Sequence, residues 1–198
     1  MQEFGLIAVI LLLCILLSAF GGSVQKRQRD PQTGETRQIE VNKFFQRANI
    51  DNVLKYSSWM AVMAVGATIL IISGGIDLSI GSIYCLAAVS GALFLQAFGP
   101  EGPYRGGSPA LITLIGILLT MLVGIVCGAM NGLLVILLRV HPFIITLGTM
   151  LIFRGIAFVQ TRAQAITDFP PEFGQVFRGT WMDVTYFPLI VMVVVVAF

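Results

Sequence analysis

The chain has 198 residues, of which 57% are hydrophobic and 11% are charged, and its formal net charge is +2. Soluble domains have about a quarter of their residues charged, so this composition, with a mean hydropathy of +0.90, excludes an ordinary soluble fold and indicates a membrane protein. The small net charge, without a basic patch around aromatic residues, argues against nucleic-acid binding.

The apolar residues fall in long continuous runs. A helix needs about 20 apolar residues to span a membrane, whereas a β-barrel shows short alternating segments. We therefore expect an all-α fold, a polytopic transmembrane helical bundle with broken or re-entrant helices, forming one transmembrane domain over residues 1–198. We expect this domain to be incomplete at its C-terminus, because the last run, from Phe187, is still apolar at Phe198.

The first run, Phe4 to Phe20, predicts a membrane helix that is retained in the mature protein. A secretion signal is disfavoured because Glu3 stands where such signals carry basic residues, and because the residues before Gly21 form a poor cleavage site.

Residues 23–56 form a polar interval between the first two apolar runs. Its first half contains a proline and a glycine and nothing suited to burial, which predicts a solvated loop. From Val41 to Trp59 the apolar residues lie near helical spacing, which favours a short interfacial helix leading into the membrane, with a partly ordered loop as the alternative. Asn49 or Asn52 is the expected N-cap of that helix.

The runs Trp59 to Ser73 and Ile80 to Phe98 are joined by the polar stretch ISGGIDLSIGS. Gly74 and Gly75 suit the end of one helix, and Asp77 or Ser79 suits the cap of the next.

A carboxylate near the membrane is costly and by default marks a functional or water-lined site, and transporters line substrate paths with broken helices. Three interpretations of Asp77 stay open: capping alone, capping together with lining a path, and proton or ion coupling.

The run from Ala110 to Val140 would be about 47 Å long as a helix, so it must tilt, break or protrude. Asn131-Gly132 and the sequence Arg139 to Pro142 are candidate break points, before a further apolar run from Phe143 to Val159. Small residues recur at every fourth position and predict a face for close helix packing. They are Gly116, Thr120, Gly124, Gly128 and Gly132.

Enzyme and metal chemistry have no support in the sequence. His141 has no second ligand nearby, so we expect an interfacial position and no metal site. Arg154 is expected either to reach the interface or to pair with Asp77. The chain has no phosphate-binding GxxxxGK[ST] loop, nucleophile elbow or HExxH motif, and its three cysteines suit helix packing.

Two stretches resemble the permease subunits of bacterial ABC importers of the ribose, xylose and galactose type. They are GGIDLSIGS at residues 74–82 and NGLLVILLRVHPFIITLGTMLIFRG at residues 131–155, within a resemblance that covers roughly residues 45–165. It implies the membrane-spanning permease of an ATP-driven monosaccharide importer, a multi-pass protein of the bacterial inner membrane that forms the translocation path.

The resemblance also implies partners: a second permease subunit, cytoplasmic ATPase subunits that use ATP, and an extracytoplasmic sugar-binding protein. We expect the chain itself to be no enzyme and to bind no cofactor and no metal. The candidates for the translocation path or the helix break are Gly74, Gly75, Asp77, Ser79, Ser82, Asn131 and Thr146, and those for helix packing are Gly116, Gly124, Gly128 and Gly132.

Two other functions remain open at this stage. One is an ion-coupled secondary transporter that uses Asp77, and the other is a truncated, non-transporting membrane scaffold. The side of the membrane on which residues 23–56 lie is open too. The Lys and Arg residues of this interval favour the cytoplasmic side, whereas the resemblance implies a cytoplasmic N-terminus and therefore places the interval outside.

Overall fold

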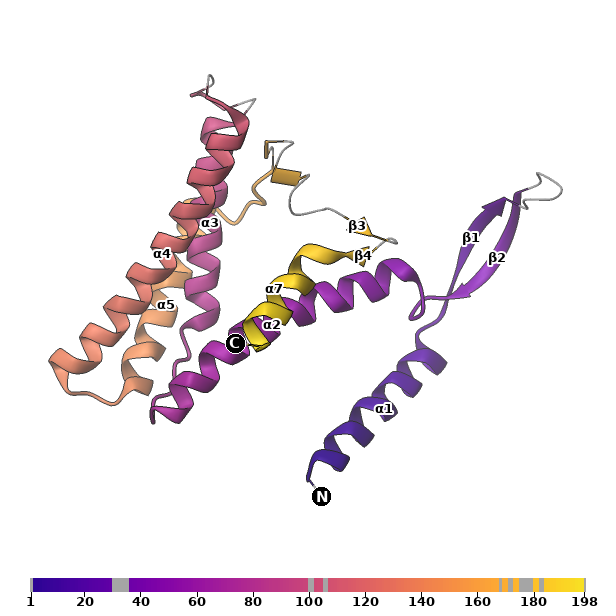
Figure 1. Cartoon of the computed structure of the whole chain (residues 1–198), viewed down its shortest axis with the longest axis horizontal. Helices are drawn as coiled ribbons and strands as arrows, with labels where there is room; N and C mark the ends of the chain where they lie inside the picture. Colours follow the sequence, from indigo (N-terminus) through magenta and orange to yellow (C-terminus); the bar gives the residue numbers. More distant parts are fainter. Residues whose placement is uncertain are drawn as a thin grey trace.

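The computed structural model describes residues 2–29, 36–99, 102–104, 107–167, 169–170, 173–174, 180–181 and 184–197. Most of these residues are helical (Figure 1). In chain order the elements are α1 (Gln2–Phe20), β1 (Ser23–Arg29), β2 (Thr36–Asn42), α2 (Arg47–Ile72), α3 (Ile80–Phe98), α4 (Pro109–Leu138), α5 (Pro142–Thr161), β3 (Thr180–Trp181), β4 (Val184–Thr185) and α7 (Tyr186–Ala197).

Four helices, α2 to α5, are long and apolar enough to cross a membrane. This confirms the predicted polytopic helical bundle. The apolar part of α1, Ile7–Phe20, is shorter, so its role as a membrane helix stays a prediction.

The helices pack in two groups. Helices α3, α4 and α5 lie against one another, while α2 runs at an angle to them and packs against α7 (Figure 1).

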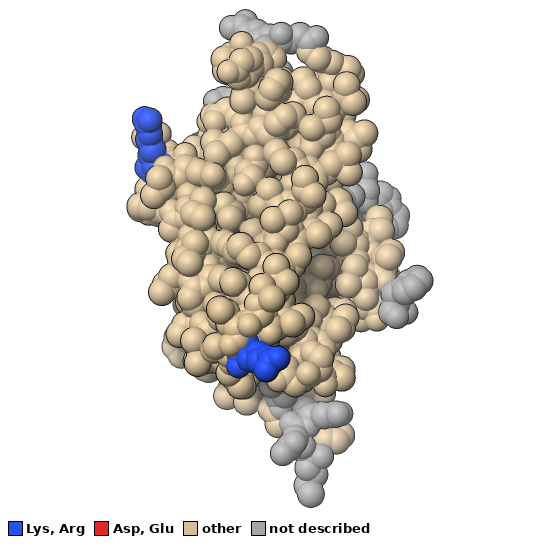
Figure 2. Space-filling model, turned by 90° about the vertical axis from the view of Figure 1, so that its left-hand side faces the viewer, with Lys and Arg blue, Asp and Glu red and all other residues tan. Residues whose placement is uncertain are grey.

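The accessible surface is 14467 Å², against about 9,100 Å² for a compact protein of this mass. Much apolar surface is thus uncovered, and the face shown in Figure 2 is almost free of charge. Such a surface suits lipid or neighbouring membrane helices.

Close contact between α3 and α4 depends on two glycines. A Cβ atom on Gly91 would lie 2.0 Å from Thr120 Oγ1, and one on Gly116 would lie 2.7 Å from a methyl carbon of Leu95. Because neither glycine has a side chain, the two helices approach closely. Deeper in the group, the buried core joins α3, α4 and α5 through Leu86, Cys127, Phe153 and Ala157.

The predicted packing face of α4 is occupied only in part. Of the four predicted packing glycines, Gly116 contacts α3, whereas a Cβ on Gly124, Gly128 or Gly132 would meet no atom of another element within 4 Å in the described part of the chain. Packing at these three glycines therefore stays a prediction.

The solvated loop predicted for the first half of residues 23–56 was wrong where the structure describes it, because strands form there. Strands β1 and β2 form an antiparallel hairpin, in register from Ser23 opposite Asn42 to Arg29 opposite Thr36, while residues 30–35 lie outside the described part. The Asn42 side chain donates to Ser18 O (2.6 Å) and accepts from Phe44 N (2.9 Å), which ties the hairpin base to the end of α1. Hydropathy does not reveal this backbone pairing, because the hydrogen bonds join backbone groups of two strands and do not depend on apolar side chains.

No separate interfacial helix forms between the described hairpin and the membrane run. Helix α2 begins at Arg47 with Gln46 as N-cap and continues without a break to Ile72. The predicted caps were wrong, since Asn49 and Asn52 lie inside the helix and the Asn49 side chain donates backwards to Phe44 O (3.0 Å).

One of the two breaks predicted in the apolar run from Ala110 to Val140 is confirmed. Helix α4 continues through Asn131 and Gly132, so the break predicted there was wrong, and it ends where Arg139 adopts a left-handed conformation (φ 52°) before Pro142 opens α5. The Asn131 amide bonds to Ser79, immediately before α3, so it does not compete for hydrogen bonds of its own backbone.

We predict that Gly91→Ala destabilises the protein by about 1–3 kcal/mol, because the added methyl overpacks the contact with Thr120. Gly124→Ala is the matched control, with open space at the added methyl and no expected loss. Thermal unfolding in detergent measures both variants. Equal losses would show that the α3–α4 contact is less tight than described.

Candidate functional site

The end of α2 is a glycine-terminated helix stop. Gly74 adopts φ +82°, its N–H donates to Ile71 O (3.0 Å), and the N–H of Gly75 donates to Leu70 O (3.0 Å). This hydrogen-bond pair is the Schellman motif, which needs a left-handed residue and therefore favours glycine. The helix end predicted at Gly74 and Gly75 is confirmed.

Asp77 lies in the unwound segment between α2 and α3. Its Oδ1 accepts two hydrogen bonds from Ser79, one from the backbone N–H (2.6 Å) and one from the hydroxyl (2.6 Å). Ser79 occupies the N-cap position of α3, as one of the two predicted candidates, but its side chain accepts no hydrogen bond from the first turn. Asp77 instead orders the residue immediately before the helix.

Asn131 of α4 continues this hydrogen-bonded chain. Its Nδ2 donates to Ser79 Oγ (2.7 Å). A serine hydroxyl has one hydrogen, which Ser79 gives to Asp77, so Ser79 must accept from the amide nitrogen. The other amide atom, Asn131 Oδ1, is buried and has no partner among the described residues.

Thr146 of α5 pairs with the unwound backbone. Its Oγ1 accepts from Leu78 N (3.2 Å) and lies 3.3 Å from Ile76 O, with Phe143 O at the same distance. Backbone groups that leave a helix need partners in a membrane protein, and here a side chain of another helix supplies them. Residues 76–79 are thereby attached to both α4 and α5.

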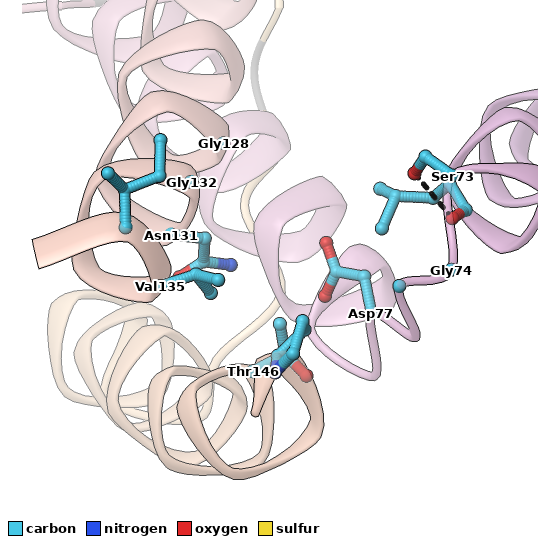
Figure 3. A pocket seen from close by; sticks show the side chains of 12 residues that line it. Ser73, Gly74, Asp77, Gly128, Asn131, Gly132, Val135 and Thr146 are labelled. Atoms are coloured by element: carbon cyan, nitrogen blue, oxygen red, sulfur yellow. Dashed lines mark hydrogen bonds between the residues drawn. The ribbon is translucent and has the colours of Figure 1, made fainter. Parts of the chain in front are cut away.

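A pocket of about 380 Å³ opens beside Asp77, between the end of α2 and one face of α4 (Figure 3). Its volume is in the usual range of roughly 300–1,000 Å³ for small-molecule sites. The lining residues are Leu70, Ser73, Gly74, Gly75, Asp77, Gly128, Asn131, Gly132, Val135, Ile136, Pro142 and Thr146.

The pocket gathers most of the predicted path residues. Ser79 and Ser82 do not line it: Ser79 is fully buried and bonded to Asp77, and the Ser82 hydroxyl donates to Ser79 O (2.8 Å). Sequence reasoning missed the apolar lining residues of α2 and α4, because apolar residues facing a pocket look the same in sequence as those facing lipid.

The site lies towards one end of the helix group. Thr146 is four residues into α5, about 6 Å from its start, and Asn131 is seven residues before the end of α4, about 10 Å. Since α4 and α5 are joined at this end, the pocket opens near the turn between them (Figure 1).

Two other polar residues singled out in the sequence, His141 and Arg154, do not line the pocket. His141 caps α5, accepting from Phe143 N at its Nδ1 (3.3 Å), and the described residues contain no cluster of metal-binding side chains. Arg154 is exposed, and no ion pair between it and Asp77 is found in the described part of the chain.

These features define a multi-pass helical membrane protein with a discontinuous helix beside a largely apolar pocket that contains a few polar side chains, an arrangement that transporters use to bind solutes. The family described as branched-chain amino acid transport system / permease component matches residues 49–198. The chain belongs to this family.

Curated relatives agree with that assignment. The chain is 36% identical over 137 residues to a D-allose transport system permease protein of Escherichia coli (strain K12), covering 69% of this chain and 39% of that protein. It is 36% identical to the ribose import permease protein of the same strain, over 62% of this chain and 35% of that protein. It is 38% identical to the galactose/methyl galactoside import permease protein of that strain, over 57% of this chain and 34% of that protein.

The chain thus spans less than half the length of each of these relatives. No solved structure matches it.

We predict that Thr146→Val costs about 1–3 kcal/mol, because the Leu78 N–H loses its partner while side-chain volume is kept. Thr149→Val is the control, since the Thr149 hydroxyl bonds only within its own helix. Hydrogen exchange of residues 76–79, followed by mass spectrometry, is expected to accelerate in the first variant alone. Unchanged exchange in Thr146→Val would contradict the assignment.

Proposed function

We propose that this chain is the membrane-spanning permease subunit of an ATP-driven ABC importer for monosaccharides, located in the bacterial inner membrane. The observation that carries the proposal is the family match over residues 49–198, together with relatives named as allose, ribose and galactose permeases. In this proposal the pocket beside Asp77 is a section of the translocation path.

The chemistry of the pocket supports a polyhydroxylated solute. Asp77 accepts, the hydroxyls of Ser73 and Thr146 both donate and accept, and aliphatic side chains such as Val135 cover the remaining wall. Sugars present hydroxyls that both donate and accept and also C–H faces, so they match this mixture. Binding sites with a few placed polar groups in an apolar lining are typical for small molecules.

The proposed subunit performs no chemical reaction. A second permease subunit would complete the path, cytoplasmic ATPase subunits would supply energy from ATP, and an extracytoplasmic binding protein would deliver the sugar. The uncovered apolar faces of α4 and α5 support helix neighbours or lipid on that side.

Reconstitution tests the function directly. The full-length protein is placed in liposomes with the complete set of permease, ATPase and binding-protein products of the same operon, and uptake of labelled allose, ribose and galactose is measured with and without ATP. We expect uptake of at least one sugar that needs both ATP and this subunit. Uptake that persists without the subunit, or that an uncoupler abolishes while ATP is maintained, would overturn the proposal.

We predict that Asp77→Ala lowers the uptake rate roughly tenfold or more, because a hydrogen bond to a charged group contributes about 1.5–3 kcal/mol. Abundance in the membrane, measured by immunoblot, should fall much less. Asp51→Ala is the control, because Asp51 pairs with Lys55 on α2 (3.4 Å) outside the pocket lining. Parallel losses of uptake and abundance would assign Asp77 a structural role only.

A further inference from the structure

Part of α4 faces the pocket without a packing partner. Gly128 and Gly132 both line the pocket, and a Cβ on either would meet no atom of another element within 4 Å among the described residues. Asn131 lies between them in sequence, is only 4% exposed, and its Oδ1 has no hydrogen-bond partner in the described chain. An unpaired buried acceptor calls for an explanation, since such groups are uncommon in native proteins.

The last turn of α2 forms the opposite wall of the same pocket. Leu70 and Ser73 line it from that side, and Figure 3 shows Ser73 across the pocket from Gly128 and Gly132. The Ser73 hydroxyl now donates to Leu70 O within its own helix (2.7 Å). The wall therefore carries both an apolar side chain and a hydroxyl donor.

The two walls belong to differently anchored parts of the chain. Residues 76–79 are bonded to Asn131 and Thr146 and so belong with α3, α4 and α5. Helix α2 packs instead on α7, and Ser58 is its only buried residue. The short link from Ser73 to Gly75 is where the chain passes between these two parts.

Gly74 suits a pivot in this link. It adopts φ +82°, and a Cβ there would meet nothing within 4 Å in the described structure, so no neighbouring side chain crowds it. Glycine also occupies positive and negative φ with similar ease, so a change of direction here costs no side-chain strain, although it exchanges the hydrogen bonds of Gly74 N–H to Ile71 O and of Gly75 N–H to Leu70 O.

We propose that α2 pivots at Gly74 and Gly75 and docks its last turn onto the glycine face of α4, which we define as Gly128 and Gly132. Docking closes the pocket and brings the Ser73 side chain towards the wall of α4 that contains Asn131. Small residues allow two helices to approach closely in a membrane, which explains why this face is lined by glycine although it is open here. The role of the pivot in transport rests on the proposed function: if the pocket is part of a translocation path, its closure shuts that path at this end.

Disulfide trapping tests the movement without any transported solute. The full-length protein in membrane vesicles, with its native cysteines replaced by alanine, carries Ser73→Cys and Gly132→Cys. Copper phenanthroline accepts the two electrons as the two thiols lose their protons and form the disulfide. Ser73→Cys with Met130→Cys is the control, because residues two positions apart lie on opposite faces of a helix.

We expect a disulfide in the first pair and none in the control. Adding Gly128→Leu should abolish the cross-link by filling the docking face, whereas Gly124→Leu should leave it, since Gly124 does not line the pocket. Immunoblots of membrane abundance show that each variant folds. No disulfide in the first pair, or equal cross-linking in both pairs, would overturn the pivot.

The two proposals fail separately. Disulfides as expected without ATP-dependent sugar uptake would reject the importer and keep the pivot. Sugar uptake without the disulfide in the first pair would reject the pivot and keep the importer.

Discussion

The unwound backbone between α2 and α3 must find hydrogen-bond partners within a protein that is otherwise helical and apolar. Thr146 bonds to this segment at Leu78, and Asn131 reaches it through Ser79 and Asp77. Unpaired backbone groups are costly in lipid, so the break is stable only while α4 and α5 stand beside it. The arrangement of three helices at this end depends on satisfying these few groups.

The same attachment explains why a pocket remains. The hydrogen bonds hold residues 76–79 against α4 and α5, but they stop short of Gly74 and Gly75, and α2 leaves at an angle (Figure 1). A volume of about 380 Å³ is left between its last turn and α4. The attachment of residues 76–79 and the pocket beside them are thus consequences of a single helix break.

Several features of the fold follow from local sequence, whereas others do not. The apolar runs predicted the helices, and Gly74 with Gly75 predicted the end of α2, because both depend on nearby residues. The hairpin of β1 and β2 was missed, because each strand is stabilised by its partner and not by its own hydropathy. The break expected at Asn131 was wrong, because its amide bonds to Ser79, 52 residues away in the chain.

The sequence by itself determined a multi-pass helical membrane protein and a helix stop at two glycines. Apolar length and glycine conformation act over a few residues, so they can be read directly from the chain. Only the tertiary structure decided which polar residues face one another, which glycines of α4 contact α3, and which remain open to the pocket. Those outcomes depend on the angles between helices, which are set by long-range packing.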